Sequence, residues 1–474
     1  MKENSKVNST DVAIIKSLTQ HQLLRTGIEK LGGISSLIEE GDQIFIKINI
    51  NAPYGYPVNS DFESLRDLIE LCKDAGAKQI HIGCFPNTGI KFEVIANILG
   101  FQSYIETNGA KLVFLEDQNR YPRIDIEIEN KIIQIPEVIL NSDKLIIYNQ
   151  LSVDPVFKIT LSLLNAYSMV PKKYQTVEKV IRSGKDYLFL DQYKQDLISN
   201  ILDIYSIKKP DLVINDLFYF LEAAGPYVYK DSNLLFTGLG VFGRDAVAVD
   251  LITLKLVGVD LMKSDLLLEV RNRKLGVTDI SSITIIGEDL DNVKISAKLS
   301  TDRLDDITIK NTIIKAGRIC SGCYKEAYHL LNYIKTHMTK DLKYVKKQHF
   351  LTGENPPEPE SLENTIIFGD CAINSSKNRE FRKIRTSRTK DYVESVKEKI
   401  KKDYKSQKPP KVKEKINKNI IEIPGCPPNL YKSINTVQKY YGKAQTPNLS
   451  FYNNLIKTYY EISSKTKGNT GNKQ

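Results

Sequence analysis

Short runs of β-branched and other apolar residues alternate with helical patterns along the first 300 residues of the chain. The apolar runs predict buried strands, because these residue types favour a pleated sheet. The segments between them have helical spacing, with capping residues at their starts and Gly at their ends. The predicted strands are 12–16, 43–50, 78–84, 111–117, 144–150, 211–220 and 281–289, and the predicted helices are 21–31, 60–75 and 245–256, with a further helical segment at 156–203.

The alternation of strands and helices predicts parallel pairing, because a crossover helix returns the chain to the start of a parallel neighbour. We expect residues 8–300 to form an α/β domain with a mostly parallel sheet and flanking helices. The pattern changes near residue 306, so residues 306–460 are predicted to form a smaller C-terminal α/β module that bears cysteines. The polar segment 465–474 is expected to be a disordered tail.

Four of the six cysteines lie in the predicted C-terminal module, within Cys-Ser-Gly-Cys, Gly-Asp-Cys-Ala and Pro-Gly-Cys-Pro-Pro. A Cys-x-x-Cys pair places two thiolates on one tight turn, within reach of one metal ion or one cluster face. The other two cysteines end the predicted strands 364–371 and 420–426, which should place both on the same rim of a small sheet. The predicted ligands of one metal centre are Cys320, Cys323, Cys371 and Cys426.

An iron–sulfur cluster is our preferred interpretation of this set, and structural zinc is the alternative. Zinc sites usually repeat the tight Cys-x-x-Cys pair, whereas this sequence contains one such pair. Glycines beside the cysteines let backbone amides approach thiolate or sulfide. Four thiolate ligands leave no open position on iron, so a [4Fe–4S] cluster held in this way favours electron transfer over substrate activation.

Composition limits the classes of function. The sequence has no apolar run of about 18 residues, so no membrane span is predicted. The opening MKENSKVNST lacks the apolar core of a signal peptide. We therefore expect a cytoplasmic protein, in which reduced cysteines indicate a metal centre more readily than disulfides.

The net charge of +10 is concentrated in one segment. Residues 377–418 contain 17 Lys and Arg against six Asp and Glu, so the rest of the chain is close to neutral. The chain has no Trp, and this basic insertion lacks the interleaved aromatic platform that single-strand binders use. We expect a solvated helix and linker rather than a nucleic-acid site, and docking of an acidic partner is the alternative.

Polar residues of the first domain mark a possible ligand crevice, because strand carboxyl ends face the crevice in open α/β sheets. The candidates are Lys47, Asn49, Asp216, Glu222, Arg244 and Asp245. For the last four, the alternative is that Asp245 caps its helix and that Asp216, Glu222 and Arg244 form solvated ion pairs. The spacing Gly238-x-Gly240-x-x-Gly243 matches a dinucleotide fingerprint, but no βαβ unit with a later acidic residue completes it.

Four segments carry a resemblance to a known family: VAIIK, LGGISSLIEEGDQIFIKIN, LVINDLFYFLEAAGP and GRDAVAVDLITLKLVGVD. They resemble the domain of unknown function 362 family, whose uncharacterised members are often described as iron–sulfur-centre proteins. The resemblance implies an α/β fold and, for members with added cysteine motifs, cofactors of the electron-transfer kind. It supplies no reaction, so it does not decide whether the chain is an enzyme. The Gly-Cys-Pro-Pro segment is similar to the cluster-binding loop of hydrogenase small subunits and the related respiratory complex subunit.

These features predict an iron–sulfur protein that transfers electrons, or supports a partner enzyme in redox chemistry, through a [4Fe–4S] cluster. A redox protein is the expected partner. The alternative prediction is a non-redox enzyme or ligand-binding α/β protein with its site in the crevice and a structural zinc.

Overall fold

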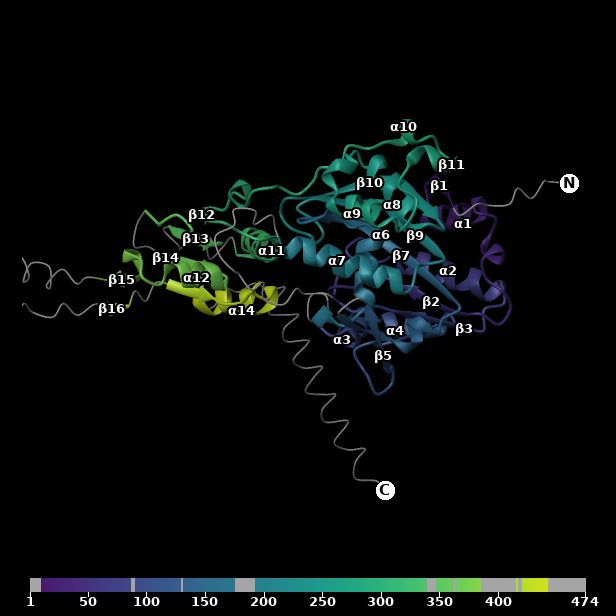
Figure 1. Cartoon of the computed structure of the whole chain (residues 1–474), viewed down its shortest axis with the longest axis horizontal. Coiled ribbons are helices and arrows are strands. Elements are labelled where there is room, and N and C mark those ends of the chain that lie inside the picture. Colours follow the sequence, from purple (N-terminus) through teal and green to yellow (C-terminus); the bar gives the residue numbers. More distant parts are fainter. Residues whose placement is uncertain are drawn as a thin grey trace, which may run out of the picture. The chain divides into compact units, whose positions relative to one another are not determined.

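The computed structural model describes residues 10–86, 90–128, 131–174, 192–338, 347–360, 364–384, 415–416 and 420–441. They fall into two compact units, one ending at Asp302 and the other beginning at Arg303 (Figure 1). Most of the basic insertion 377–418 and all of the tail 465–474 lie outside the described residues. Within the described part of the chain, no helix is long and apolar enough to cross a membrane.

Nine strands form one sheet in the described part of the first unit. Eight of them lie in the order β11 (Thr284–Gly287), β1 (Asp11–Lys16), β10 (Ser232–Gly243), β9 (Leu212–Ala223), β7 (Lys144–Asp154), β2 (Gln43–Lys47), β3 (Gln79–Gly83) and β4 (Lys111–Leu112). All of these are parallel except β10, which is antiparallel to both of its neighbours. The ninth strand, β8 (Lys158–Ile159), pairs antiparallel with β7. The predicted α/β class with a mostly parallel sheet is confirmed.

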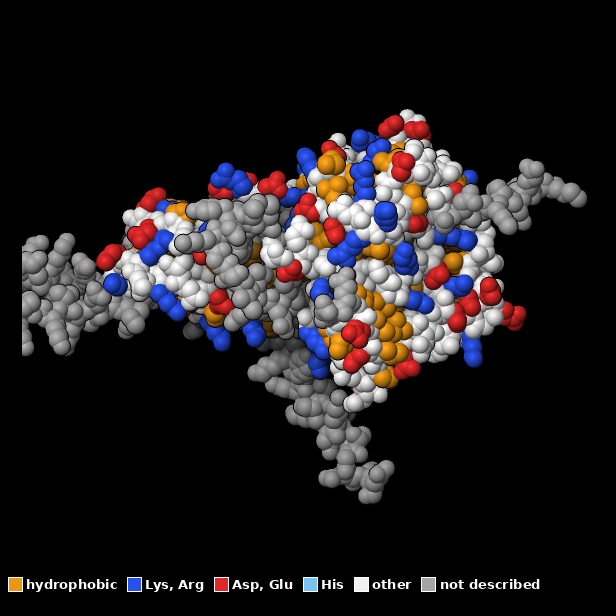
Figure 2. All heavy atoms as spheres, viewed as in Figure 1, with side chains coloured by type: hydrophobic (Ala, Val, Ile, Leu, Met, Phe, Trp, Pro, Cys, Tyr) orange, Lys and Arg blue, Asp and Glu red, His pale blue; other side chains and the backbone are white. Residues whose placement is uncertain are grey.

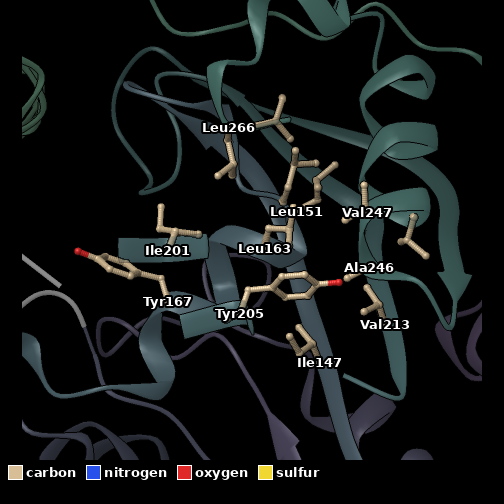
Figure 3. Packing of buried hydrophobic residues seen from close by; sticks show 14 of the residues in the cluster. Ile147, Leu151, Leu163, Tyr167, Ile201, Tyr205, Val213, Ala246, Val247 and Leu266 are labelled. Carbon is tan, nitrogen blue, oxygen red and sulfur yellow. The ribbon is translucent and has the colours of Figure 1, made fainter. Parts of the chain in front are cut away.

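Helices cover both faces of this sheet. Successive residues of a strand point to opposite faces, so Val12 and Ile14 of β1 enter one core, and Ala13 and Ile15 enter the other. One face carries α1 (Gln20–Lys30), α2 (Phe62–Asp74), α3 (Phe92–Leu99) and α4 (Phe101–Thr107), and the other carries α6 (Ser162–Ala166), α7 (Gln192–Ile207), α8 (Ala246–Leu256) and α9 (Asp265–Arg273). Figure 3 shows the second core, where Tyr205, Leu163 and Val213 lie among other buried apolar side chains.

Smaller elements complete the first unit. They are the hairpin of β5 (Arg123–Ile128) and β6 (Lys131–Pro136), and the short helices α5 (Glu137–Leu140) and α10 (Leu290–Val293). In the view of Figure 2, acidic and basic side chains are mixed over the surface of this unit and form no single positive face.

Several local predictions were wrong. The segment 156–203 is no single helix, because its described part contains β8 and the short α6 before α7 begins at Gln192. The predicted strand 111–117 ends after Leu112. By contrast, the sequence analysis set aside the dinucleotide fingerprint from Gly238 to Gly243, and the structure agrees: this segment lies inside β10, a strand between two others, and forms no phosphate-binding loop.

The second unit contains a four-stranded parallel sheet in its described part. Its strands lie in the order β12 (Thr312–Ala316), β13 (Gln348–Thr352), β14 (Asn364–Phe368) and β17 (Ile420–Ile423). Helix α11 (Ser321–His337) follows β12, α12 (Asp370–Ser376) follows β14, and α14 (Leu430–Tyr441) follows β17, while β15 (Lys383–Ile384) and β16 (Lys415–Ile416) pair with each other. This is a second, smaller α/β sheet, whose strand β13 the sequence analysis did not predict.

Gly27 provides a test of the packing of α1. A Cβ at this buried position would lie 2.5 Å from the Phe242 ring. Gly27→Ala should therefore lower the free energy of unfolding by about 1–3 kcal/mol through overpacking, although an unhindered helical Gly→Ala change usually stabilises. Urea unfolding measures the change, with Glu29→Ala on the exposed face of α1 as the control. An unchanged or raised stability in Gly27→Ala would contradict this packing.

Candidate functional site

The four cysteines follow three strands of the small sheet, at one of its edges. Cys320 follows β12 by four residues, and Cys371 and Cys426 each follow their strands, β14 and β17, by three. Cys320 is the N-cap of α11, and Cys323, three residues later, lies in the first turn of this helix. Because the strands are parallel, their carboxyl ends share one edge. All four cysteines therefore belong to the same edge of the second unit.

Hydrogen bonds join the loop after β14 to the loop after β17. The Gly369 N–H donates to the Ile423 carbonyl at 2.9 Å, and the Asp370 N–H donates to the Gly425 carbonyl at 3.0 Å. In return, the Gly425 N–H donates to Asp370 Oδ1 at 2.9 Å. This reciprocal pair, which we call the Asp370 clamp, fixes the loops that carry Cys371 and Cys426 against each other.

Glycine is required on both sides of the clamp. Gly369 and Gly425 have φ angles of 91° and 139°, which side-chain-bearing residues rarely adopt. A Cβ on Gly425 would lie 2.6 Å from Pro428 Cα, and a Cβ on Gly369 would lie 3.3 Å from Cys323 Sγ. The thiol of Cys323 therefore lies against the loop that leads to Cys371.

The four thiols affect one another electrostatically. The pKa of Cys323 is raised well above its usual value by a hydrogen bond with Cys320, then by burial, and also by the charges of Cys320, Cys371 and Cys426. Charges shift a pKa in this way only at short range, so the four sulfur atoms lie close to one another. Among the described residues, however, no group of three or more His, Cys, Asp or Glu side chains is arranged so that it could hold a metal ion.

The N-terminus of α11 adds a positive electrostatic potential that favours negatively charged groups. Cys320 is the N-cap of this 17-residue helix, and Cys323 lies within its first turn. The first amides of a helix have no acceptor within the helix and carry a partial positive charge. Such a site favours thiolates over neutral thiols.

The structure does not bring the six crevice candidates together. Asp245 caps α8 by accepting from the Ala248 N–H at 2.9 Å, which is the alternative considered for it. Arg244 follows the end of antiparallel β10 and donates to Ser36 Oγ, so it lies at the sheet edge opposite Lys47. There, Arg244 and Lys144 line an open hollow of about 460 Å³ together with the carboxylates of Glu39 and Asp211.

Glu222 also has a structural role. Its carboxylate accepts from Asn233 Nδ2 at 2.6 Å and from the Lys298 N–H at 2.8 Å. It thereby links β9 to β10 and to the segment that follows α10. Arg244 and Asp245 therefore lie at the other sheet edge from Lys47, and the Glu222 carboxylate is taken up in joining neighbouring segments.

Lys47 and Asn49 do lie together: Lys47 is the last residue of β2, and Asn49 follows two residues later. The Lys47 ammonium is fully buried and donates to Asn165 Oδ1 at 2.6 Å. Asn165 Nδ2 in turn donates to Asn49 Oδ1 at 2.8 Å, and the Gln150 N–H donates to the same oxygen at 3.0 Å. Burial lowers the pKa of Lys47 to about 8. This is a packed polar network, and its partners come from distant parts of the chain.

Asp216 lies nearby on β9 and is 2% exposed. It accepts from Tyr148 Oη at 2.6 Å and from Gln20 Nε2 at 3.2 Å. Burial raises the pKa of Asp216 to about 6. The sequence analysis missed Tyr148 and Gln20, because nothing in their local sequence marks them as partners of a carboxylate.

Asp250 is a further buried carboxylate that the sequence analysis did not select. It accepts from the N–H groups of Ser162 and Leu163, both at 2.9 Å, and from Asn215 Nδ2 at 2.9 Å. Burial raises the pKa of Asp250 to about 6. A lone Asp within the otherwise apolar run AVAVDLITL was the available signal.

By fold, the first unit is an α/β protein with a mostly parallel sheet. Residues 44–255, from β2 to α8, match the family described as domain of unknown function (DUF362). One solved structure that the chain matches is the lactate racemase apoprotein from Thermoanaerobacterium thermosaccharolyticum, with 9% identity and a TM-score of 0.35; the match covers 74% of this chain and 70% of that chain. At this level of similarity, nothing about that protein's activity transfers to this chain. No curated protein sequence matches the chain.

The Asp370 clamp can be tested locally. Asp370→Ala removes the acceptor of the Gly425 N–H, which should weaken local stability by about 1–2 kcal/mol and speed exchange of that amide by about 5- to 30-fold. Hydrogen exchange with mass spectrometry on the segment 420–426 measures this. Asp370→Asn keeps an acceptor oxygen and should exchange at nearly the wild-type rate. Equal rates in all three proteins would show that the clamp does not hold the loops.

The raised pKa of Asp216 predicts that the stability of the folded protein depends on pH. Its pKa of about 6 in the folded protein exceeds its usual value of 3.8, so the folded form binds the proton more tightly than the unfolded chain. This stabilisation is lost as pH rises through about 6. The free energy of unfolding should therefore fall by about 1 kcal/mol between about pH 5 and about pH 7 because of Asp216. Urea unfolding of Asp216→Asn should therefore show a shallower fall over this window. The exposed Glu29→Gln should keep the wild-type slope, and an unchanged slope in Asp216→Asn would contradict the prediction.

Proposed function

We propose that the second unit holds one [4Fe–4S] cluster through Cys320, Cys323, Cys371 and Cys426, and that the protein transfers electrons to a partner in the cytoplasm. One observation carries this proposal: four cysteines that follow three strands lie at a single edge of one parallel sheet. When bound, a cluster of this kind accepts and donates one electron at a time. Four thiolate ligands would leave no open iron position for substrate, which supports electron transfer as its role.

The pattern of the cysteine segments supports a cluster over a single zinc ion. Zinc sites usually repeat the tight Cys-x-x-Cys pair, whereas this chain contains one such pair. The donor set, which consists entirely of sulfur, also suits iron–sulfur chemistry.

The surrounding residues have separate tasks in this proposal. The Asp370 clamp would keep Cys371 and Cys426 in register, so that little ordering is needed when the centre forms. Cys323, at 3% exposure, would form the inner side of the site. Cys320, Cys371 and Cys426 are partly exposed, which would leave one side open to a partner.

The basic residues that follow Cys371 in the sequence would suit an acidic redox partner. The basic insertion begins just after α12, the helix that carries Cys371, and its described residues Lys377, Arg379, Arg382 and Lys383 belong to the same unit as the cysteines. Arg382 pairs with Glu422 of β17, so part of this charge is neutralised within the unit. The remaining basic residues would attract an acidic surface at a rate that falls with salt.

Cysteine substitutions in the full chain test the proposal. Cys371→Ser and Cys426→Ser should each lose most of the bound iron and sulfide after anaerobic purification, because each removes one of four thiolate ligands. Cys72→Ala and Cys84→Ala are the matched controls. Burial raises the pKa of both these thiols to about 12, so they remain neutral and should leave the iron content unchanged.

Two outcomes of the cysteine series would contradict the proposal. Full iron and sulfide in the Cys371→Ser and Cys426→Ser proteins would mean that these cysteines are not ligands. Zinc in the wild type, released by the same two substitutions, would instead support the alternative of a structural zinc in a non-redox α/β protein.

A further inference from the structure

Thr352 is a buried polar residue whose side chain has no partner. It is fully buried, and its hydroxyl oxygen Oγ1 makes no hydrogen bond within the described part of the chain. Valine has almost the same shape and favours strands equally. Burying a hydroxyl without a partner is unfavourable, so such a group calls for a specific explanation.

The position of Thr352 places it at the cysteine edge. It is the last residue of β13, and in the sheet register it lies between Ala316 of β12 and Phe368 of β14. Those are the last residues of the strands that lead to Cys320 and Cys371. The Thr352 carbonyl accepts from the Gly317 N–H at 2.8 Å, which holds this end of β13 in place. Thr352 therefore stands midway between two of the cysteine-bearing loops.

The two faces of the small sheet have different neighbours. Leu351 packs with Ile367 and with Ala372 of α12, so α12 covers that face. Because strand side chains alternate, Thr352 points to the opposite face together with Phe350. The Phe350 ring lies 5.6 Å from the Phe368 ring on this second face. The Thr352 hydroxyl therefore points away from α12.

The thiol of Cys323 lies close to the same strand end. It is next to Gly369, the residue that directly follows Phe368, the register partner of Thr352. The hydroxyl of Thr352 and the thiol of Cys323 thus approach the end of β14 from two neighbouring elements. A sulfur-based centre in this position would offer acceptors to a hydroxyl that otherwise has none.

We propose that the Thr352 hydroxyl donates a hydrogen bond to a sulfur atom of the centre held by the four cysteines. This inference rests on the proposed function and adds a residue that tunes the site. A hydrogen bond to a cluster or ligand sulfur stabilises the more negative, reduced state, and so raises the reduction potential. Thr352 would set the potential without being a ligand.

Three variants of the full chain test this inference. Thr352→Val removes the hydroxyl and keeps the shape, so it should bind as much iron as the wild type and shift the reduction potential downward. Thr352→Ser keeps the hydroxyl and should keep the wild-type potential. Thr312→Val is the matched control, because Thr312 accepts from Gln348 Nε2 at 2.6 Å at the amino end of the same sheet. It should also keep the wild-type potential.

An anaerobic redox titration followed by visible absorption, with iron analysis of each protein, measures these effects. A potential in Thr352→Val equal to that of the wild type would overturn the inference and leave the proposed function standing. If Thr352→Val fails to fold, Thr352→Ala in place of valine gives the same comparison, with the same downward shift expected. A wild-type protein that holds zinc or no iron would contradict the proposed function itself, and this inference with it.

Discussion

The hydrogen bonds that align β14 with β17 and continue into the Asp370 clamp determine where two of the four cysteines lie. Phe368 stands opposite Ile423 in the register, and the clamp extends this alignment by two residues into the loops. A slip of one residue between the strands would turn every side chain to the other face and separate Cys371 from Cys426. The cysteine edge therefore depends on sheet register as well as on the cysteines themselves.

The family match and the cysteines belong to different units of the chain. The DUF362 match covers residues 44–255 and so lies within the first unit, whereas the cysteine edge lies wholly in the second. In the first unit, Lys47 and Asp216 are buried charges held by neutral hydrogen-bonding side chains. Such charges are expensive to bury. The part of the chain that matches DUF362 thus contains a buried polar network of its own, whereas the proposed electron-transfer site belongs to the second unit.

Local pattern was enough to predict most strands of the large sheet and the two strands that precede Cys371 and Cys426, but it missed β10, β12 and β13. The apolar runs before Cys371 and Cys426 are short strands followed by glycine turns, and both features are readable within a few residues. The predicted helix 60–75 begins one residue before the observed cap of α2, which is Asp61: its side chain accepts from the Ser64 N–H at 2.7 Å. An error of this size is usual where several capping residues adjoin.

Contacts between distant residues could not be predicted from the sequence. Lys47 meets Asn165, 118 residues away, because β2 and β7 are neighbours in the sheet. The candidates Arg244 and Asp245 were separated from Lys47 because β10 runs antiparallel between β1 and β9, and no local periodicity encodes strand order or direction. The unpaired hydroxyl of Thr352 was missed for the same reason, since β13 itself was not predicted.

The most direct test of the central claim is the metal and sulfide content of the wild-type full chain after anaerobic purification, together with its visible absorption before and after chemical reduction. The account predicts about four irons and about four sulfides per chain, with broad absorption that bleaches on reduction. A colourless protein with about one zinc per chain would contradict it, since that is the signature of a structural zinc site.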